Sequence, residues 1–451
     1  MSDNASKKLF IKTYGCQMNV YDSQRIADVL RPLGYQTTDA ADDADMMILN
    51  TCHIREKATE KVFSDLGRLK KHKDKAKVNG KRAIIGVAGC VAQAEGDVIT
   101  TRAPYVDMVF GPQTYHTLAE MVVRLQGGNE TRIINTDFPA EAKFDLLPDD
   151  RQTDAATAFV SVQEGCDKFC TFCVVPYTRG AEYSRPVQSI LDEITRLIET
   201  GGIKEITLLG QNVNAYHGLG PDGAVWSLAR LMAALQDING LERIRYTTSH
   251  PRDMDDDLIA AHRDLSKVMP FLHLPVQSGS DAILKAMNRK HTAAEYVDII
   301  ARLRTARPDI ALSSDFIIGF PGETETDFES TLALVRQVGF SSAFSFKYSP
   351  RPGTPAAAMA PMLPEKIKAA RLQELQNVLF QQQNDFNVAH MGQVMPVLFE
   401  RVRREDGALH GRTPYNQGIN VPGNPRLIGH IEAVRVTQAH TNSMWGEIVV
   451  Q

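Results

Sequence analysis

The chain has 451 residues, of which 43% are hydrophobic and 23% are charged, and its 50 lysines and arginines are offset by 54 aspartates and glutamates. This composition is typical of a globular protein of about two to four domains. It excludes a mostly disordered chain, a collagen-like repeat and a small disulfide-stapled scaffold. No stretch approaches the roughly 20 apolar residues of a membrane span, and the N-terminus lacks the pattern of a signal peptide. We therefore expect a cytoplasmic protein with no membrane attachment.

The first 125 residues alternate short apolar runs with amphipathic segments. Strands that alternate with helices favour an open parallel sheet with helices on both faces, so we predict an N-terminal α/β domain over residues 7–125. The predicted strands lie at residues 9–11, 46–49, 83–87 and 106–110, and the predicted helices at residues 26–33 and 55–71.

Three cysteines of this region each follow a predicted strand. Cys16 comes after the first strand, Cys52 after the second and Cys90 after the third, at separations of 36 and 38 residues. Because the carboxyl ends of parallel strands share one edge, where ligands bind, the three thiols can converge on a single site. The alternative is three unrelated buried cysteines, since free cysteine often packs as a small hydrophobic side chain.

Residues 126–157 are polar and without clear periodicity, which predicts a linker. Beyond it, six strand candidates separated by helical segments predict a partial (βα)6 barrel over residues 158–385, open where the eight-unit barrel is closed. The active site of such a barrel lies at the mouth formed by the carboxyl ends of its strands. The six strands are predicted at residues 158–162, 205–209, 243–247, 271–274, 315–318 and 343–348.

The C-terminal segment changes character after an amphipathic stretch at residues 365–386. Five short strands with Gly and Pro turns predict a small β-barrel of the oligonucleotide-binding type over residues 386–451. Six arginines there could contact phosphate, but six acidic residues cancel their charge, so an RNA role depends on how the arginines are distributed. They are Arg401, Arg403, Arg404, Arg412, Arg426 and Arg435.

The remaining three cysteines, Cys166, Cys170 and Cys173, form a C-x3-C-x2-C motif in the loop after the first barrel strand. A structural zinc site needs four protein ligands, and no histidine lies between Cys166 and His217 to supply a fourth. Three thiolates instead suit a [4Fe–4S] cluster with three irons held by the protein and one left open. The open iron can chelate the amino and carboxylate groups of a small molecule.

This motif, with Phe172 directly before its third cysteine, resembles the C-x3-C-x-aromatic-C signature of the radical S-adenosylmethionine (SAM) enzymes. The resemblance implies that Cys166, Cys170 and Cys173 hold a catalytic cluster, with Phe172 beside the bound SAM. It also implies that the cluster gives an electron to SAM, which splits into methionine and a 5′-deoxyadenosyl radical. Breaking an unactivated C–H bond requires such a radical, and the protein positions the cofactor that makes it.

Further motifs narrow the resemblance to the methylthiotransferases and extend it over nearly the whole chain. The resemblance implies that Cys16, Cys52 and Cys90 hold an auxiliary [4Fe–4S] cluster that carries or donates sulfur, so that each cluster keeps one open position. One SAM would supply the methyl group and a second the radical, and the C-terminal barrel would be a TRAM domain, which favours RNA. The matching stretches are residues 14–19, 50–58, 86–90, 179–185, 209–213, 273–280 and 315–324.

Within the family, the start Tyr-Gly-Cys-Gln-Met-Asn at residues 14–19 is similar to the branch that methylthiolates C2 of N6-(dimethylallyl)adenosine at position 37 of tRNA. The branch acting on threonylcarbamoyladenosine has Gly-Cys-Lys-Val-Asn there, and the branch acting on ribosomal protein S12 has Gly-Cys-Pro-Lys-Asn. Both stay open as alternatives, as does a non-catalytic RNA-binding protein with a structural metal. We expect tRNA as the partner, a reducing electron donor such as flavodoxin or ferredoxin, and a monomer.

Other residues have weaker signals. Gln277 and Asp315 lie at the ends of the predicted fourth and fifth barrel strands, where they either hold polar groups of SAM or organise loops. Residues 201–205 (GGIKE) only loosely resemble the Gly-Gly-Glu element that grips the SAM amino group in relatives. His53, beside Cys52, could be a fourth cluster ligand, but we favour a surface imidazole or one whose hydrogen bonds are satisfied within the fold. Residues 68–82 carry eight lysines and arginines and one aspartate, and form either a solvated helix end or a contact with tRNA phosphates.

Overall fold

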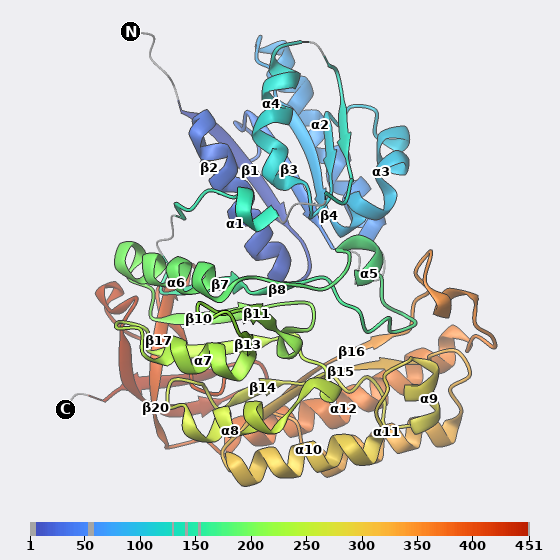
Figure 1. Cartoon of the computed structure of the whole chain (residues 1–451), viewed down its shortest axis with the longest axis vertical. Helices are drawn as coiled ribbons and strands as arrows, with labels where there is room; N and C mark the ends of the chain where they lie inside the picture. The colour runs from blue at the N-terminus through green and yellow to red at the C-terminus, as the bar shows by residue number, and fades with distance from the viewer. Residues whose placement is uncertain (1–5, 53–57, 129, 140–142, 152–154, 450–451) are drawn as a thin grey trace. The chain divides into compact units, whose positions relative to one another are not determined.

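The structure, a computed structural model, describes residues 6–52, 58–128, 130–139, 143–151 and 155–449 (Figure 1). The chain folds as two compact units, Met1–Gln152 with Val174–Ala181, and Thr153–Cys173 with Glu182–Gln451. The segment 174–181 therefore belongs to the first unit, although the residues on both sides of it belong to the second. None of the described helices is both long and apolar enough to cross a lipid bilayer.

The first unit is built on a parallel sheet with the strand order β2-β1-β3-β4-β5-β6. This confirms the predicted open parallel sheet and adds two edge strands, β2 and β6, which are too short to show a hydrophobic period. Strand β6 lies within residues 126–157, the segment expected to be a linker. The strands are β1 (Lys7–Thr13), β2 (Tyr35–Thr37), β3 (Met46–Thr51), β4 (Ile84–Gly89), β5 (Met108–Phe110) and β6 (Ile133–Asn135).

Helices cover both faces of this sheet, because its central strands are apolar on both sides. Ile48 of β3 packs in one core cluster with Met121 of α4 and with residues of α1. The next residue, Leu49, points to the opposite face and packs with Leu66 of α2 and with residues of α3. The helices are α1 (Gln17–Leu30), α2 (Ala58–Val78), α3 (Cys90–Arg102) and α4 (Leu118–Gln126), and the short α5 (Val175–Thr178) lies in the segment 174–181.

The second unit contains six parallel strands in the order β7-β10-β13-β14-β15-β16, which confirms the partial (βα)6 barrel. The ladder is interrupted between β13 and β14, where a single parallel bridge between Ile244 and Val268 continues the arc. Because β7 and β16 are each paired on one side only, the arc stays open there. The strands are β7 (Thr157–Ser161), β10 (Glu205–Leu209), β13 (Arg243–Thr247), β14 (Phe271–His273), β15 (Ala311–Ile318) and β16 (Ser342–Lys347).

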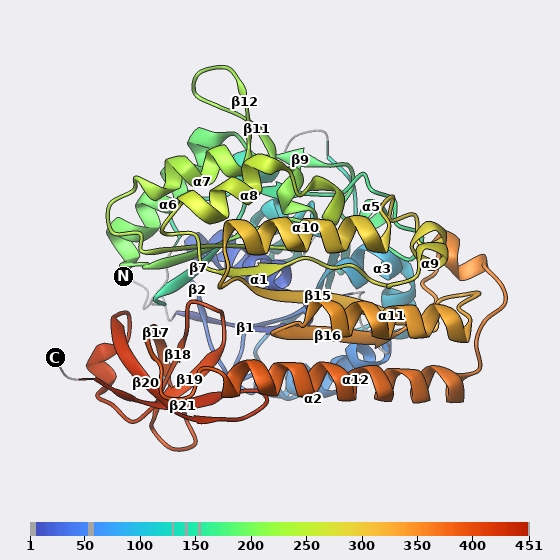
Figure 2. The same ribbon diagram turned by 90° about the horizontal axis from the view of Figure 1, so that it is seen from below.

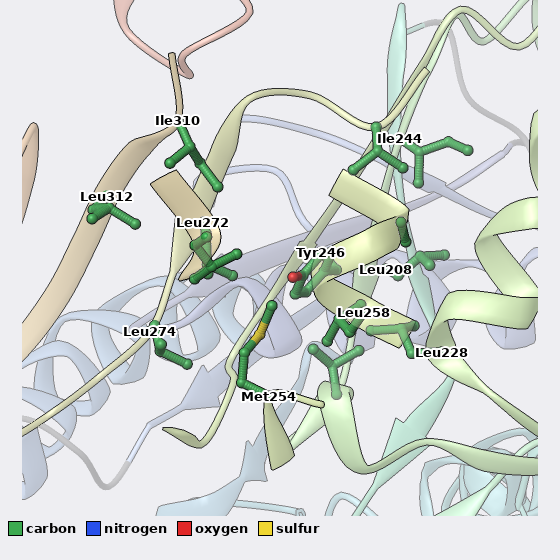
Figure 3. Close-up of a cluster of buried hydrophobic side chains, with 14 of the residues drawn as sticks. Leu208, Leu228, Ile244, Tyr246, Met254, Leu258, Leu272, Leu274, Ile310 and Leu312 are labelled. Carbon is green, nitrogen blue, oxygen red and sulfur yellow. The ribbon is translucent and has the colours of Figure 1, made fainter. Parts of the chain in front are cut away.

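Alternate residues of these strands pack against the surrounding helices. Leu208, Ile244, Leu272 and Leu312 come from four different strands and meet in one apolar core (Figure 3). Since successive side chains of a strand point to opposite faces, the intervening residues line the concave face of the barrel. The helices are α6 (Val187–Gly201), α7 (Leu228–Gln236), α8 (Asp256–Asp264), α9 (Asp281–Ala286), α10 (Ala293–Ala306) and α11 (Glu325–Val338), and the short strands are β8 (Gln163–Glu164), β9 (Tyr183–Ser184), β11 (His217–Leu219) and β12 (Val225–Ser227).

Helix α12 (Glu365–Val388) leads from this barrel to a closed barrel of five short strands, β17-β18-β19-β21-β20, as predicted. Figure 2 shows α12 running along β16 and ending at the small barrel. The five strands are β17 (Val394–Val402), β18 (Leu409–Arg412), β19 (Gly418–Val421), β20 (Ile431–Ala439) and β21 (Met444–Ile448).

Buried arginines tie the small barrel to the amino-terminal end of the large one. Arg243, at the start of β13, donates to two backbone carbonyls of the small barrel at 2.6 and 3.0 Å, and Arg245 donates to two others at 2.8 and 2.9 Å. Glu205, at the start of β10, accepts from Arg245 Nε at 2.9 Å and lies 3.6 Å from Arg243 Nη1, so one carboxylate offsets part of the two buried positive charges. Hydrogen bonds from these two arginines therefore hold the small barrel against the amino-terminal end of the large barrel.

Candidate functional site

The carboxyl edge of the first sheet gathers three cysteines. Cys16 precedes the first residue of α1, Cys52 directly follows β3, and Cys90 is the first residue of α3, just after β4. The Cys52 thiol hydrogen-bonds to Cys16, and Cys16 in turn acts electrostatically on Cys90. Three thiols that are far apart in the sequence therefore lie together in the fold.

Two glycines make this convergence possible. Gly15 has φ +96°, and a Cβ there would lie 2.1 Å from Cys52 Cβ. Gly89 has φ +87°, and a Cβ there would lie 2.3 Å from the carbonyl oxygen of Thr51. Each Gly-Cys pair therefore needs its glycine, both for the backbone conformation and for the close approach of the neighbouring strand end.

The electrostatics of the three thiols differ. The hydrogen bond from Cys52 lowers the pKa of Cys16 to about 6 against the opposing effect of burial, and the positive charge of Arg179 adds to the lowering. Burial raises the pKa of Cys90 above the ordinary value. Because the thiolate is the metal-binding form of cysteine, Cys16 is available as a ligand at neutral pH.

Arg179, in the segment 174–181, brings a buried positive charge to these thiols. Its Nη2 lies 2.6 Å from Asp22 Oδ2 and 3.3 Å from Asn19 Oδ1, and its side chain also hydrogen-bonds to Cys90. Asn19 Oδ1 in turn accepts from Cys16 Sγ at 3.8 Å. A nearby cation favours the charged form of each thiol, so these surroundings suit thiolate ligands.

In the second unit, the loop that carries Cys166, Cys170 and Cys173 is held at the mouth of the barrel by polar side chains. Lys168 Nζ lies 2.7 Å from Asp253 Oδ1, in the loop after β13. The other carboxylate oxygen of Asp253 accepts from Asn212 Nδ2, after β10, at 2.8 Å. The loop is therefore anchored by residues from the carboxyl ends of two barrel strands.

The three cysteines of this loop have different environments. Cys170 is buried and accepts a hydrogen bond from Arg289 Nη1 at 3.5 Å. The backbone N–H of Cys173 donates to the carbonyl oxygen of Cys170 at 2.9 Å, which closes a tight turn. Cys166 is half-buried, and burial raises the pKa of its thiol to about 11. The loop thus presents three sulfur atoms from one short, well-anchored turn.

The three residues expected near SAM occupy different positions. Phe172 packs against an apolar cluster that includes Met287 and Phe320, so it anchors the loop. Gln277 has φ +79°, a strained conformation often found at functional sites, and its N–H donates to the carbonyl oxygen of Asp315 at 2.9 Å. Asp315 was expected to begin a strand, but β15 starts at Ala311, so Asp315 lies in the middle of it. The first four residues of β15, Ala-Leu-Ser-Ser, have low strand propensity, so the sequence did not predict that the strand begins at Ala311.

Residues 201–205 lie at the opposite end of the barrel from the cysteine loop. Gly202 ends α6 with φ +65°, and Glu205 begins β10, where it holds Arg245. Their loose likeness to a SAM-binding element was therefore misleading, because they sit at the amino-terminal ends of the strands. His53, the weaker candidate beside Cys52, lies outside the described residues.

A group of buried polar residues at the mouth of the barrel was not singled out from the sequence. The rings of His250 and His291 lie 5.7 Å apart, and burial lowers the pKa of His250 to about 2 and that of His291 to about 4, so both are neutral at pH 7. Among the described residues, certain atoms of this group have no hydrogen-bond partner, which suits a site for a polar ligand. These atoms are Asn212 Oδ1, Ser249 Oγ, His250 Nε2, Arg289 Nε and His291 Nε2. The only sequence signal for this group was the motif at residues 209–213.

Each donor set offers three thiols, which suits an iron–sulfur cluster with one open iron. Within the part of the chain that the structure describes, no three His, Cys, Asp or Glu side chains gather closely enough to hold one metal ion. In a cubane each thiolate binds a different iron atom, so the three sulfur atoms need not converge on one point. Two sets of three cysteines, with buried polar atoms unpartnered beside the second set, therefore match two such clusters and a polar cofactor.

The basic stretch at residues 68–82 forms the end of α2 and the turn after it. Lys73 is engaged within the fold, because its Nζ lies 2.6 Å from Asp107 Oδ2 and donates to the carbonyl oxygen of Tyr105 at 2.8 Å. Arg68 pairs with Asp65 at 2.9 Å. The lysines of α2 that remain exposed in this stretch are Lys70, Lys71, Lys75 and Lys77.

The arginines of the small barrel divide into two groups. Arg412 lies 3.3 Å from Glu400, and Arg435 lies 3.8 Å from Glu447. Arg403 lies between two acidic residues at 3.5 and 3.6 Å. Three further arginines, Arg401, Arg404 and Arg426, are exposed on the surface.

Three family models match successive parts of the chain. Residues 8–111 match the Uncharacterized protein family UPF0004, residues 160–335 match the Radical SAM superfamily, and residues 389–449 match the TRAM domain. The first match covers the sheet with Cys16, Cys52 and Cys90, and the second covers the barrel with the cysteine loop. The third coincides with the small barrel.

Two solved structures share the fold at 13% sequence identity. One is the radical S-adenosylmethionine methyltransferase TsrM from Kitasatospora setae with cobalamin and a [4Fe–4S] cluster bound, with a TM-score of 0.56 over 78% of this chain and 77% of that chain. The other is the cobalamin-dependent S-adenosylmethionine radical enzyme OxsB, with a TM-score of 0.52 over 83% of this chain and 56% of that chain. At this identity the likeness concerns the fold alone.

Proposed function

By its three matched domains this chain belongs to the radical SAM methylthiotransferase family, and we propose that it replaces the C2 hydrogen of N6-(dimethylallyl)adenosine, next to the tRNA anticodon, with a methylthio group. The observation that carries the proposal is the pair of cysteine triads. Each triad lies at the carboxyl edge of a parallel sheet, and each has a buried arginine hydrogen-bonded to one of its sulfur atoms.

The barrel residues have roles that follow from their positions. Cys166, Cys170 and Cys173 would hold one [4Fe–4S] cluster, which together with SAM supplies the radical chemistry needed to break an unactivated C–H bond. The unpartnered polar atoms of Asn212, Ser249, His250 and His291 would bind SAM, and Gln277 would add a further polar contact. The apolar packing of Phe172 keeps the cysteine loop in place while these groups orient the cofactor.

The residues of the first unit would serve the transfer of sulfur. Cys16, Cys52 and Cys90 would hold the auxiliary [4Fe–4S] cluster, whose open position is suited to a sulfur ligand. Arg179 keeps positive charge beside these thiolates, and its pair with Asp22 fixes its orientation. With three cysteines at each site, no protein thiol blocks the open position.

The concave face of the barrel favours an apolar substituent on the base. Phe344 and Phe346 on β16 are 59% and 39% exposed, and they pair in register with Asp315 and Ile317 of β15, on the face turned away from the helical core. Exposed aromatic rings suit stacking of a nucleobase and packing of a dimethylallyl chain. The acidic Asp315 on the same face would repel the carboxylate of threonylcarbamoyladenosine, which supports the prenylated substrate.

We place RNA contacts on the small barrel and on α2. The TRAM match supports RNA binding, and the exposed Arg401, Arg404 and Arg426 can approach phosphates. The exposed lysines of α2 add a second basic patch, from which Lys73 is excluded by its pair with Asp107. Because such contacts are electrostatic, the affinity for tRNA should fall as the salt concentration rises. A tRNA substrate and reduced clusters place the protein in the cytoplasm, and a low-potential donor such as flavodoxin or ferredoxin would supply its electrons.

Anaerobic reconstitution tests the proposed function. We expect about eight irons per chain and, with SAM and a reductant, 2-methylthio product on prenylated tRNA but none on the same tRNA without the prenyl group. Nucleoside analysis by mass spectrometry measures both products. Activity on ribosomes or on threonylcarbamoylated tRNA instead would assign one of the other branches. If the protein contained zinc in place of iron and did not cleave SAM, the result would support a non-catalytic RNA-binding protein instead.

Replacement of Phe344 by alanine should weaken recognition of the prenyl group. Removing a ring that a ligand buries costs about 1.5–3 kcal/mol, so we expect the preference for prenylated over unprenylated tRNA in competition binding to fall by about 10- to 100-fold. Phe380 on α12 is 48% exposed and lies outside the proposed site, so F380A is the matched control and should keep the preference. An unchanged preference in F344A would remove Phe344 from the site.

A further inference from the structure

Arg289 is a buried cation that forms no ion pair with a carboxylate among the described residues. It lies in the turn between α9 and α10 and is 5% exposed. Its Nη1 donates to Cys170 Sγ at 3.5 Å, its Nη2 donates to the carbonyl oxygen of Pro275, and its Nε has no partner. Because a buried charge is costly unless it is compensated, the negative charge that balances Arg289 must come from another source.

The two histidines and the lysine near Arg289 do not supply that charge. His250 and His291, which lie within the electrostatic reach of Arg289, are neutral when unprotonated and cationic when protonated, so neither can balance a guanidinium. The nearby cation Lys168 is already paired with Asp253 at 2.7 Å. Among the described residues, Cys170 is the one group hydrogen-bonded to Arg289 that can become an anion.

The positive charge of the arginine at the other cysteine triad is balanced in a different way. Arg179 has its own carboxylate partner, Asp22, at 2.6 Å, and both side chains are almost fully buried. Arg289 has only a sulfur atom and a backbone carbonyl. The positive charge beside Cys170 is therefore fully available to a negative group bound there, whereas the charge beside Cys90 is partly neutralised.

We propose that Arg289 is a positioning residue that raises the reduction potential of the cluster held by Cys166, Cys170 and Cys173. It does so by donating a hydrogen bond to Cys170 and by supplying the counter-charge of the cluster. Each electron from an external one-electron donor adds one negative charge beside the guanidinium, while no bond forms or breaks at Arg289 and no proton moves. Hydrogen bonds to cluster sulfur atoms and local charge are established determinants of iron–sulfur potentials.

This inference rests on the cluster assigned to the barrel in the proposed function, but not on the tRNA substrate. The test uses the full-length chain with Cys16, Cys52 and Cys90 replaced by alanine, so that one cluster gives the whole signal. The midpoint potential is measured without SAM, by titration with dithionite monitored by electron paramagnetic resonance. Iron and sulfide are determined first, because a parent protein without a cluster contradicts the proposed function rather than this inference.

We expect R289Q to lower the midpoint potential so that the reduction equilibrium falls at least about tenfold, which is 59 mV for a one-electron couple. R289K keeps the charge but cannot bridge Cys170 and Pro275, so its midpoint should lie between those of the parent and R289Q. Lys290 is exposed, and K290Q removes the same charge one residue away, so it should leave the midpoint unchanged.

A midpoint in R289Q equal to that of the parent overturns the proposal, and so does an equal shift in K290Q. If R289Q folds but does not retain its cluster, the iron content of R289K tests the proposal instead. Iron retained by R289K but not by R289Q supports a counter-charge role. Iron lost equally from both variants, with circular dichroism unchanged, contradicts it, because the charge alone should rescue binding.

Discussion

Replacement of Cys170 by alanine is expected to abolish reductive cleavage of SAM, with a loss of roughly a thousandfold or more. The same loss is expected for Cys166 and Cys173. All three thiolates are needed to hold one cluster, so the removal of any one of them abolishes the same activity. The measured quantity is 5′-deoxyadenosine released in the presence of dithionite, determined by chromatography. Iron should fall from about eight to about four per chain, because only one cluster is lost.

A serine variant separates the loss of the ligand from the loss of volume. C170S keeps the size of the side chain and its contact with Arg289 but replaces the soft sulfur donor, so it should be as inactive as C170A. Circular dichroism shows whether the fold is kept. An alanine variant that still releases 5′-deoxyadenosine at the parental rate would show that this loop does not hold the catalytic cluster.

Replacement of Cys90 by alanine should separate the two activities. The barrel residues are untouched, so 5′-deoxyadenosine is still released, while the methylthiolated nucleoside falls below detection because the sulfur site has lost a ligand. The change is small in volume and removes no hydrogen bond needed by the sheet, so the protein should remain folded. Mass spectrometry of digested tRNA measures the product, and iron analysis should again give about four atoms per chain.

Cys16 and Cys52 provide the comparison within the same triad. Each alanine variant should reproduce the behaviour of C90A, because Cys16, Cys52 and Cys90 lie together and serve one cluster. Full product formation by any of the three variants would contradict the assignment of an auxiliary cluster to this edge of the sheet. Loss of SAM cleavage in all three would instead indicate that the two sites depend on each other.

The sequence by itself determined the architecture of both units. Short apolar runs, each followed by a polar turn, predicted the parallel sheet and the six-stranded arc, because burial on both faces leaves a local signature in each strand. The same pattern placed Cys16, Cys52 and Cys90 after the ends of three strands. The C-x3-C-x2-C spacing identified the second cysteine set within one loop. All these features depend on residues that are close together in the sequence.

Only the tertiary structure decided what surrounds the cysteines. Arg289 contacts Cys170 across 119 positions of sequence, and Arg179 contacts Asp22 across 157 positions. Such contacts arise because packing brings distant loops to one edge, and no local spacing in the chain records which polar side chains will meet there.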